Sequence, residues 1–255
     1  MQNWWIFTPF SLDAPMPAIA QLARPGSHLI EAAPSGDDQL ARMVRIHQPL
    51  VSEAEKATVS DERPVSIAGD CCAVIAVLAG VQRAGIDPML VWLDAHGDFN
   101  THATTVSGFV GGMPLAMLTG RGDQTLLRAD KLPPLADTDV ILADARDLDP
   151  AERGLLQQSR VTHTHDFESL VDRVAGRPFH VHFDADVIDA AEAPAMAYPV
   201  PGGPSVETLR RVVTRLHETG NLVSASMTPW AFDRDTDGRT AAACWSIFSA
   251  LVGEP

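Results

Sequence analysis

Short apolar runs alternate along the chain with longer amphipathic or apolar segments. The short runs predict strands at residues 4–8, 64–68, 89–93, 139–143, 161–163, 179–183 and 222–227. The longer segments predict helices at residues 38–57, 71–84, 114–118, 166–174, 205–217 and 240–252, with a further helix opening at Asp149-Pro150. Pro49 is expected to disturb the first helix. This alternation predicts a single α/β domain over residues 1–255, a three-layer α-β-α sandwich around a mainly parallel sheet.

Acidic and imidazole side chains follow the predicted strands. Asp94, His96 and Asp98 alternate after the strand at 89–93, and alternate residues of an extended chain point to the same face. Asp184 and Asp186 follow the strand at 179–183 in the same way. The carboxyl ends of parallel strands meet at one edge of a sheet, and carboxylates gathered there repel one another unless a cation neutralises them. The pattern therefore predicts a site for a divalent metal ion.

Charge and cysteine content narrow the class of protein. The formal charge of −14 disfavours binding to nucleic acid or to an anionic membrane surface. Three cysteines, two of them adjacent, do not form the pattern of a disulfide framework. The N-terminus has no signal-peptide pattern, and no apolar run is long enough to span a bilayer. We expect a soluble, cytoplasmic protein that acts on a small molecule.

Seven segments carry a resemblance to a known superfamily. They are TPFSLDAP, AGDCC, DAHGDFNT, TTVSGFVGGMP, RDLDPAE, HFDADVIDA and YPVPGG. In this order they resemble the ureohydrolase superfamily, which contains arginase, agmatinase and formiminoglutamase, and the likeness covers most of the chain. The resemblance implies an arginase-like fold, hydrolysis of a linear C–N bond, and a homo-oligomer, either a trimer or a hexamer.

The resemblance also implies a metal centre. Five residues match ligands of the superfamily's two-manganese (Mn²⁺) centre: Asp94, His96, Asp98, Asp184 and Asp186. Asp94 and Asp184 match the ligands that bridge the two ions. In this superfamily the ions share and activate a hydroxide that attacks the guanidinium carbon. Asp98 also matches the catalytic carboxylate that orients this nucleophile.

A pocket for the amino-acid end of a substrate is implied as well. Asn100, Thr105 and Ser107 match positions that bind the substrate α-carboxylate, and Asp149 and Glu152 match positions that face the α-ammonium group. The same residues have ordinary structural explanations. Asp149 and Glu152 suit the N-terminus of a helix, and the two hydroxyl residues suit a turn.

Three positions depart from the arginase pattern. Cys71 stands where arginases have a metal-binding histidine. As a thiolate it would ligate and shift the preference toward zinc or iron, whereas as an inert buried thiol it would leave one site weakened or empty. Gly111 replaces the histidine that shuttles protons, and Ser226, which is expected among the substrate-binding residues, replaces the glutamate that pairs with the guanidinium group.

These departures define the functional hypotheses. Cys71 and Gly111 make the pattern resemble the hydroxyarginine hydrolase of D-cycloserine biosynthesis more than arginase, although Ser226 separates the chain from both. An N-hydroxyguanidine is less basic than a guanidine, so its leaving group needs less proton assistance. The leading hypothesis is a metal-dependent hydrolase of a guanidine or N-hydroxyguanidine in an arginine-derived amino acid. The alternatives are a catalytically impaired paralogue with a structural or regulatory role, and an amidohydrolase acting on an amide or formimino group.

Overall fold

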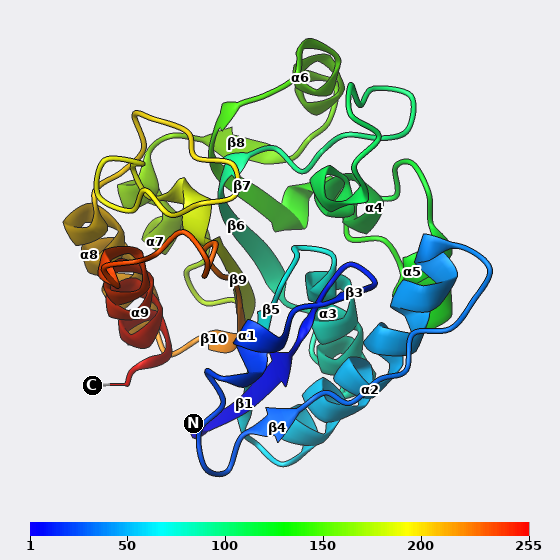
Figure 1. The fold of residues 1–255 in the computed structure, drawn as a ribbon. Coiled ribbons are helices and arrows are strands. Elements are labelled where there is room, and N and C mark those ends of the chain that lie inside the picture. Colours follow the sequence, from blue (N-terminus) through cyan, green and yellow to red (C-terminus); the bar gives the residue numbers. More distant parts are fainter. Residues whose placement is uncertain (255) are drawn as a thin grey trace.

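Eight parallel strands form one sheet through the middle of the molecule (Figure 1). The computed structural model describes residues 1–254. The strands of this sheet are β1 (Asn3–Thr8), β4 (His28–Leu29), β5 (Arg63–Ala68), β6 (Met89–His96), β7 (Val140–Asp147), β8 (Thr162–Thr164), β9 (Phe179–Asp184) and β10 (Leu222–Thr228). Their order across the sheet is β4-β1-β5-β10-β9-β6-β7-β8, and each neighbouring pair is parallel. A small antiparallel pair, β2 (Phe10–Ser11) and β3 (Ala14–Pro15), lies outside the sheet.

Helices cover both faces of the sheet. They are α1 (Pro17–Ala20), α2 (Gln39–Val59), α3 (Ala73–Arg83), α4 (Pro114–Leu118), α5 (Thr125–Asp130), α6 (Pro150–Gln157), α7 (Leu170–Arg173), α8 (Val206–Glu218) and α9 (Arg239–Val252). Short 3-10 turns form η1 (Val110–Gly112), η2 (Asp137–Asp139), η3 (Phe167–Ser169) and η4 (Ala185–Val187). One core lies between the sheet and α7, α8 and α9, and the other between the sheet and α2 to α5. The predicted three-layer α-β-α sandwich is confirmed.

The alternation of side chains decides what each face of the sheet presents. In β6, Val91 and Leu93 belong to the α8–α9 core, whereas Leu90 and Trp92 belong to the core beneath α3. Both faces are therefore apolar, which explains why the whole run is hydrophobic. In β9 the α8–α9 face is equally apolar, but the face toward α3 carries His180 and His182. The layer beneath α3 thus contains polar groups close to the edge where the acidic residues lie.

Several element boundaries differ from the sequence prediction. Helix α2 runs unbroken through Pro49, supported by its packing against α3. The two helices approach so closely that a Cβ on Gly80 would lie 2.5 Å from the Val51 carbonyl oxygen. Helix α3 begins at Ala73 and not at position 71, because Asp70 Oδ1 accepts a hydrogen bond from the Cys72 amide and holds a turn there. The short elements β2, β3, β4, α1 and α5 were not predicted. Among residues 1–254, no helix combines the length and apolar character that a membrane span needs.

Candidate metal centre

The six predicted metal ligands meet at the carboxyl edge of the four adjacent strands β5, β10, β9 and β6. Asp94 and His96 lie at the carboxyl end of β6, and Asp184 is the last residue of β9. Asp186 follows in η4, and Cys71 sits in the turn between β5 and α3. The sixth, Asp98, lies beyond the end of β6 with a left-handed φ of 47°. Ligands far apart in sequence therefore converge because of the strand order.

Asp94, His96 and Asp186 form one side of the centre. His96 Nδ1 lies 3.0 Å from Asp186 Oδ2 and 3.5 Å from Asp94 Oδ1. The Trp92 indole and the His96 amide each donate a hydrogen bond to the Asp94 carboxylate, at 2.9 and 2.7 Å. The Ala95 amide donates to Asp186 Oδ1 at 3.2 Å. These donors hold both carboxylates in place, with ligand atoms of all three residues within 4.8 Å of one another.

Cys71, Asp98 and Asp184 form the other side. The Cys71 thiol donates to Asp184 Oδ2 at 3.0 Å, and its sulfur lies 3.3 Å from Thr228 Oγ1. Ligand atoms of Cys71, Asp94 and Asp98 also lie within 4.8 Å of one another. Asp98 Oδ2 is buried and has no hydrogen-bond partner in the part of the chain that the structure describes. Such an orphaned oxygen is costly unless a ligand satisfies it.

The electrostatics of this cluster fit a cation. Burial, reinforced by neighbouring carboxylates, raises the pKa of Asp98 and Asp184 well above the usual range. Burial and the charge of Asp186 raise the pKa of Asp94 to about 7. Burial alone would lower the pKa of His96, but hydrogen bonds to Asp186 and Asp94 raise it to about 12. These raised pKa values mean that the cluster binds protons, whose positive charge offsets the crowded carboxylates. A divalent cation would offset them in the same way, and the oxygen, nitrogen and sulfur donors of the cluster suit divalent transition metals.

The free energy of unfolding of the protein kept in chelator is expected to depend on pH. Asp94 titrates near pH 3.8 when unfolded and near pH 7 when folded, so between these values the folded state binds more protons. The free energy of unfolding should then fall as pH rises, by up to about 1.4 kcal/mol per pH unit for each such group. Carboxylates with a lowered pKa, such as Asp137, lose their contribution only below pH 3.8. Burial lowers the pKa of His180 and His182, so these histidines oppose the slope, but only below pH 6.5. Urea unfolding at several pH values measures the slope, and a chelated protein that gains stability as the pH rises above 6.5 would contradict the assignment.

The comparison with known proteins agrees with this geometry. Residues 27–253 match the sequence model of the Arginase family. The chain belongs to the arginase family. An arginase from Agrobacterium fabrum is 32% identical over 226 residues, covering 80% of this chain and 68% of that protein. An arginase from Brucella melitensis is 29% identical over 220 residues, covering 80% of this chain and 72% of that protein.

Solved arginase structures share the fold. The arginase of Bacillus subtilis superposes with a TM-score of 0.86 at 24% identity, covering 100% of this chain and 99% of that one. The arginase of Bacillus cereus superposes with a TM-score of 0.79 at 26% identity, covering 85% of this chain and 80% of that one. The eight-stranded parallel sheet between two helical layers is therefore the architecture of the arginase family.

A cavity of about 760 Å³ opens beside the acidic cluster. Of the residues expected to bind substrate, Asn100, Ser107, Asp149 and Glu152 line it. Both carboxylate oxygens of Glu152 accept backbone hydrogen bonds, from Phe99 at 2.8 Å and from Asp149 at 3.1 Å. Glu152 therefore ties the loop after β6 to the start of α6, and Asp149 is the acid placed to meet a ligand.

Two other expected residues lie outside the cavity wall. Thr105 Oγ1 accepts a hydrogen bond from the Gly108 amide at 3.0 Å, as a turn residue does. Ser226 is 4% exposed, and its hydroxyl is engaged by His180 and His182 beneath the cavity. Its neighbour on the same face of β10, Thr228, lines the cavity instead. The position argues against direct contact between Ser226 and a substrate.

Aromatic side chains form the rim of the cavity near Gly111. A Cβ at Gly111 would overlap the ring of Phe109, an exposed side chain that can move. The Phe109 ring lies 6.1 Å from the ring of Tyr198, which in turn lies 6.3 Å from the ring of His96. Position 111 thus borders the cavity but carries no group that can move a proton.

Sequence reasoning missed two residues of the centre, Thr228 and His182. Thr228 is the last residue of β10 and pairs in register with Asp184. His182 lies in β9 two residues before Asp184, and ligand atoms of His182, Asp184 and Cys71 lie within 4.8 Å of one another. The alternation that singled out Asp184 and Asp186 extends back to His182, so the sequence did contain that signal.

Proposed function

We propose that this member of the arginase family is a metal-dependent hydrolase of a linear C–N bond. The proposed substrate is a guanidine or N-hydroxyguanidine of an arginine-derived amino acid, and the proposed cofactor is a pair of divalent metal ions, with Mn²⁺ in at least one position. The observation that carries the proposal is that all six predicted ligands meet at one cavity, along which Asn100, Ser107 and Asp149 also lie. A cytoplasmic location and a homotrimer or homohexamer remain predictions from the sequence.

The residues divide into those that hold metal and those that act on substrate. Five would hold the ions: Cys71, Asp94, His96, Asp184 and Asp186. A bound pair supplies Lewis-acid activation of water near neutral pH. Asp98, with one oxygen free of any partner in residues 1–254, would add a ligand and orient the attacking water through the other oxygen. Its carboxylate would accept the proton that this water loses.

The far end of the cavity suits an amino-acid group. Asp149 offers a carboxylate for an ammonium group and accepts a hydrogen bond from Asn100 Nδ2 at 3.2 Å. Ser107 offers a hydroxyl group at the same cavity. No side chain at Gly111 can protonate a departing amine, and this favours an N-hydroxyguanidine, whose leaving group is less basic.

A second candidate is hydrolysis of an amide or formimino group. It is favoured by β10, which has Ser226 at the position of the glutamate, presents Thr228 to the cavity, and carries no carboxylate that would pair with a guanidinium group. Neutral substrates would not need that charge partner.

A substrate panel on metal-loaded protein tests the proposal. We expect protein purified without chelator to contain close to two metal ions per chain and to release ornithine from hydroxyarginine faster than from arginine. Amides and formimino compounds form the control arm. Less than one ion per chain, or two ions with no turnover of any guanidine, would contradict the proposed activity. Either result would favour the second candidate or a non-catalytic paralogue.

A further inference from the structure

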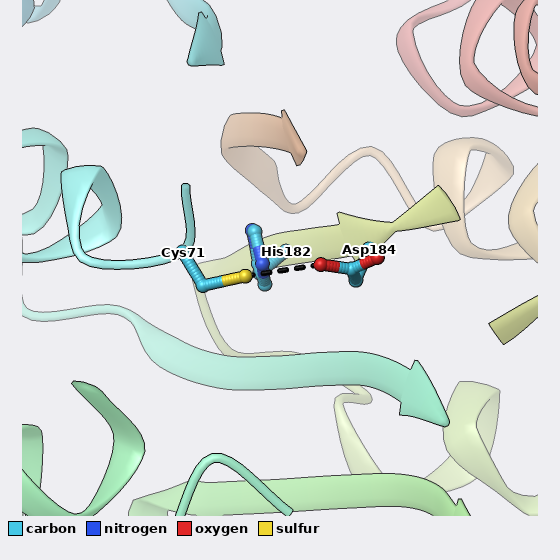
Figure 2. A group of neighbouring side chains, drawn as sticks. All are labelled: Cys71, His182 and Asp184. Atoms are coloured by element: carbon cyan, nitrogen blue, oxygen red, sulfur yellow. Dashed lines mark hydrogen bonds between the residues drawn. The ribbon is translucent and has the colours of Figure 1, made fainter. Parts of the chain in front are cut away.

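His182 is a buried imidazole that the proposed mechanism does not use. It is 1% exposed, and its Nε2 atom has no hydrogen-bond partner among residues 1–254. Figure 2 shows the ring beside Cys71 and Asp184, which are joined by the 3.0 Å hydrogen bond. An unpartnered ring nitrogen next to a thiol and a carboxylate is an arrangement that calls for a ligand.

The other ring nitrogen of His182 belongs to a chain of hydrogen bonds. His182 Nδ1 lies 2.9 Å from Ser226 Oγ, which lies 2.8 Å from His180 Nε2. His180 Nδ1 lies 2.8 Å from Ser224 Oγ. The Trp92 ring, with its centroid 4.2 Å from that of His182, packs against the imidazole and fixes its plane.

The direction of this chain decides what Nε2 offers. When His182 Nδ1–H donates to Ser226, the serine hydroxyl donates to His180 Nε2, and His180 Nδ1–H donates to Ser224. The hydroxyl proton of Ser224 then has no acceptor among residues 1–254, and the lone pair of His182 Nε2 is free beside the group of Cys71 and Asp184. In the opposite direction Ser224 donates to His180, and it is His182 Nε2 that carries a proton without an acceptor in the described part of the chain. Each direction leaves one buried donor without a partner, and only the first presents a lone pair that a metal ion can bind.

We propose that Cys71, His182 and Asp184 bind one metal ion of the pair, and that this ion is zinc or ferrous iron in place of manganese. A thiolate and an imidazole are soft and borderline donors that select Zn²⁺ or Fe²⁺, whereas the oxygen-rich group of Asp94, His96 and Asp186 suits Mn²⁺. Binding displaces the Cys71 thiol proton to solvent and replaces the hydrogen bond to Asp184 with two metal–ligand bonds.

Ser226 gains a role in this arrangement. A metal-binding histidine usually donates its second N–H to a fixed acceptor, which sets the tautomer and the ring orientation. Ser226 Oγ is that acceptor for His182. The imidazole that the arginase pattern places at position 71 is thereby supplied from β9. The inference rests on the proposed metal centre and not on the proposed hydrolysis.

A crystal structure of the wild-type protein loaded with zinc, with anomalous data at the zinc edge, tests the proposal directly. We expect a peak about 2.3 Å from Cys71 Sγ and about 2.0–2.1 Å from His182 Nε2. A peak bound to Cys71 or Asp184 but out of bonding range of His182 Nε2 would overturn the proposal, and so would no peak beside Cys71.

Zinc titration of two matched variants provides an independent measurement. His180→Gln and His182→Gln each remove a buried histidine from the same face of β9, but only the second faces Cys71. We expect folded His182→Gln protein to bind one zinc ion fewer, or to bind it at least tenfold more weakly, and His180→Gln protein to keep its zinc. Equal zinc binding by both variants would contradict the assignment. Wild-type protein that binds zinc through His182 yet hydrolyses no guanidine would refute the proposed function alone.

Discussion

Replacing Asp98 with asparagine is expected to lower hydrolysis by about 10²–10⁴-fold and at the same time to stabilise the chelated protein. Asp98 is buried, and the charges of Asp94 and Asp184 add to burial in raising its pKa. An asparagine keeps the shape and is neutral in both the folded and the unfolded state, so the chelated fold gains stability because it no longer has to bind a proton or hold a crowded charge at this position. The same change removes a metal ligand and the group that orients water, so activity and metal-induced stabilisation both fall.

Asp137→Asn is the matched control. Asp137 makes a two-point ion pair with Arg121, at 2.7 and 2.8 Å, and this pairing lowers the pKa of Asp137. Its amide variant should lose about 1–3 kcal/mol of stability and keep its activity. Thermal unfolding in chelator and in Mn²⁺, together with initial rates, separates the two patterns. Full activity in Asp98→Asn, or a loss of stability in chelator, would show that Asp98 is not a member of a repelling metal cluster.

Strand order explains why much of the centre could be predicted. Buried parallel strands produce long apolar runs, and their carboxyl ends share one edge, so Asp94 and Asp184 could be placed together from sequence alone. Asp98 was grouped with them by strand alternation, but it lies beyond β6 and reaches the cluster through a left-handed backbone. The grouping agrees with the structure, whereas the physical reason given for it holds only for Asp94 and His96.

The sequence could not indicate how far each side chain lies below the carboxyl end of its strand. Alternation says which face a residue occupies but not how far it lies below the end of the strand. Ser226 and Thr228 share a face of β10, and only the register with β9 puts Ser226 level with His182 and Thr228 level with Asp184. Such register depends on packing between strands distant in sequence, which a local pattern does not contain.

Ser226→Glu is expected to destabilise the protein by about 3 kcal/mol or more without creating arginase activity. The hydroxyl of Ser226 is enclosed by His180 and His182, and burial lowers the pKa of both histidines. A carboxyl group there would be buried as a charge without a partner, would be protonated at a pH where free glutamate is ionised, or would force a proton onto a histidine that the fold keeps neutral. Each of these states costs free energy, and the longer side chain would also displace His182 from Cys71.

Two further variants test whether Ser226 lies beneath the cavity while Thr228 lines it. Ser226→Ala removes only the hydroxyl, so it should cost about 1–3 kcal/mol and weaken zinc binding through His182. Thr228→Glu places its carboxylate at the cavity itself, where a guanidinium group could meet it. Urea unfolding and rates on arginine and hydroxyarginine measure all three variants. A stable Ser226→Glu protein with a large gain in the rate of arginine hydrolysis would mean that position 226 reaches the substrate. The inference that Ser226 lies beneath the cavity wall would then be wrong.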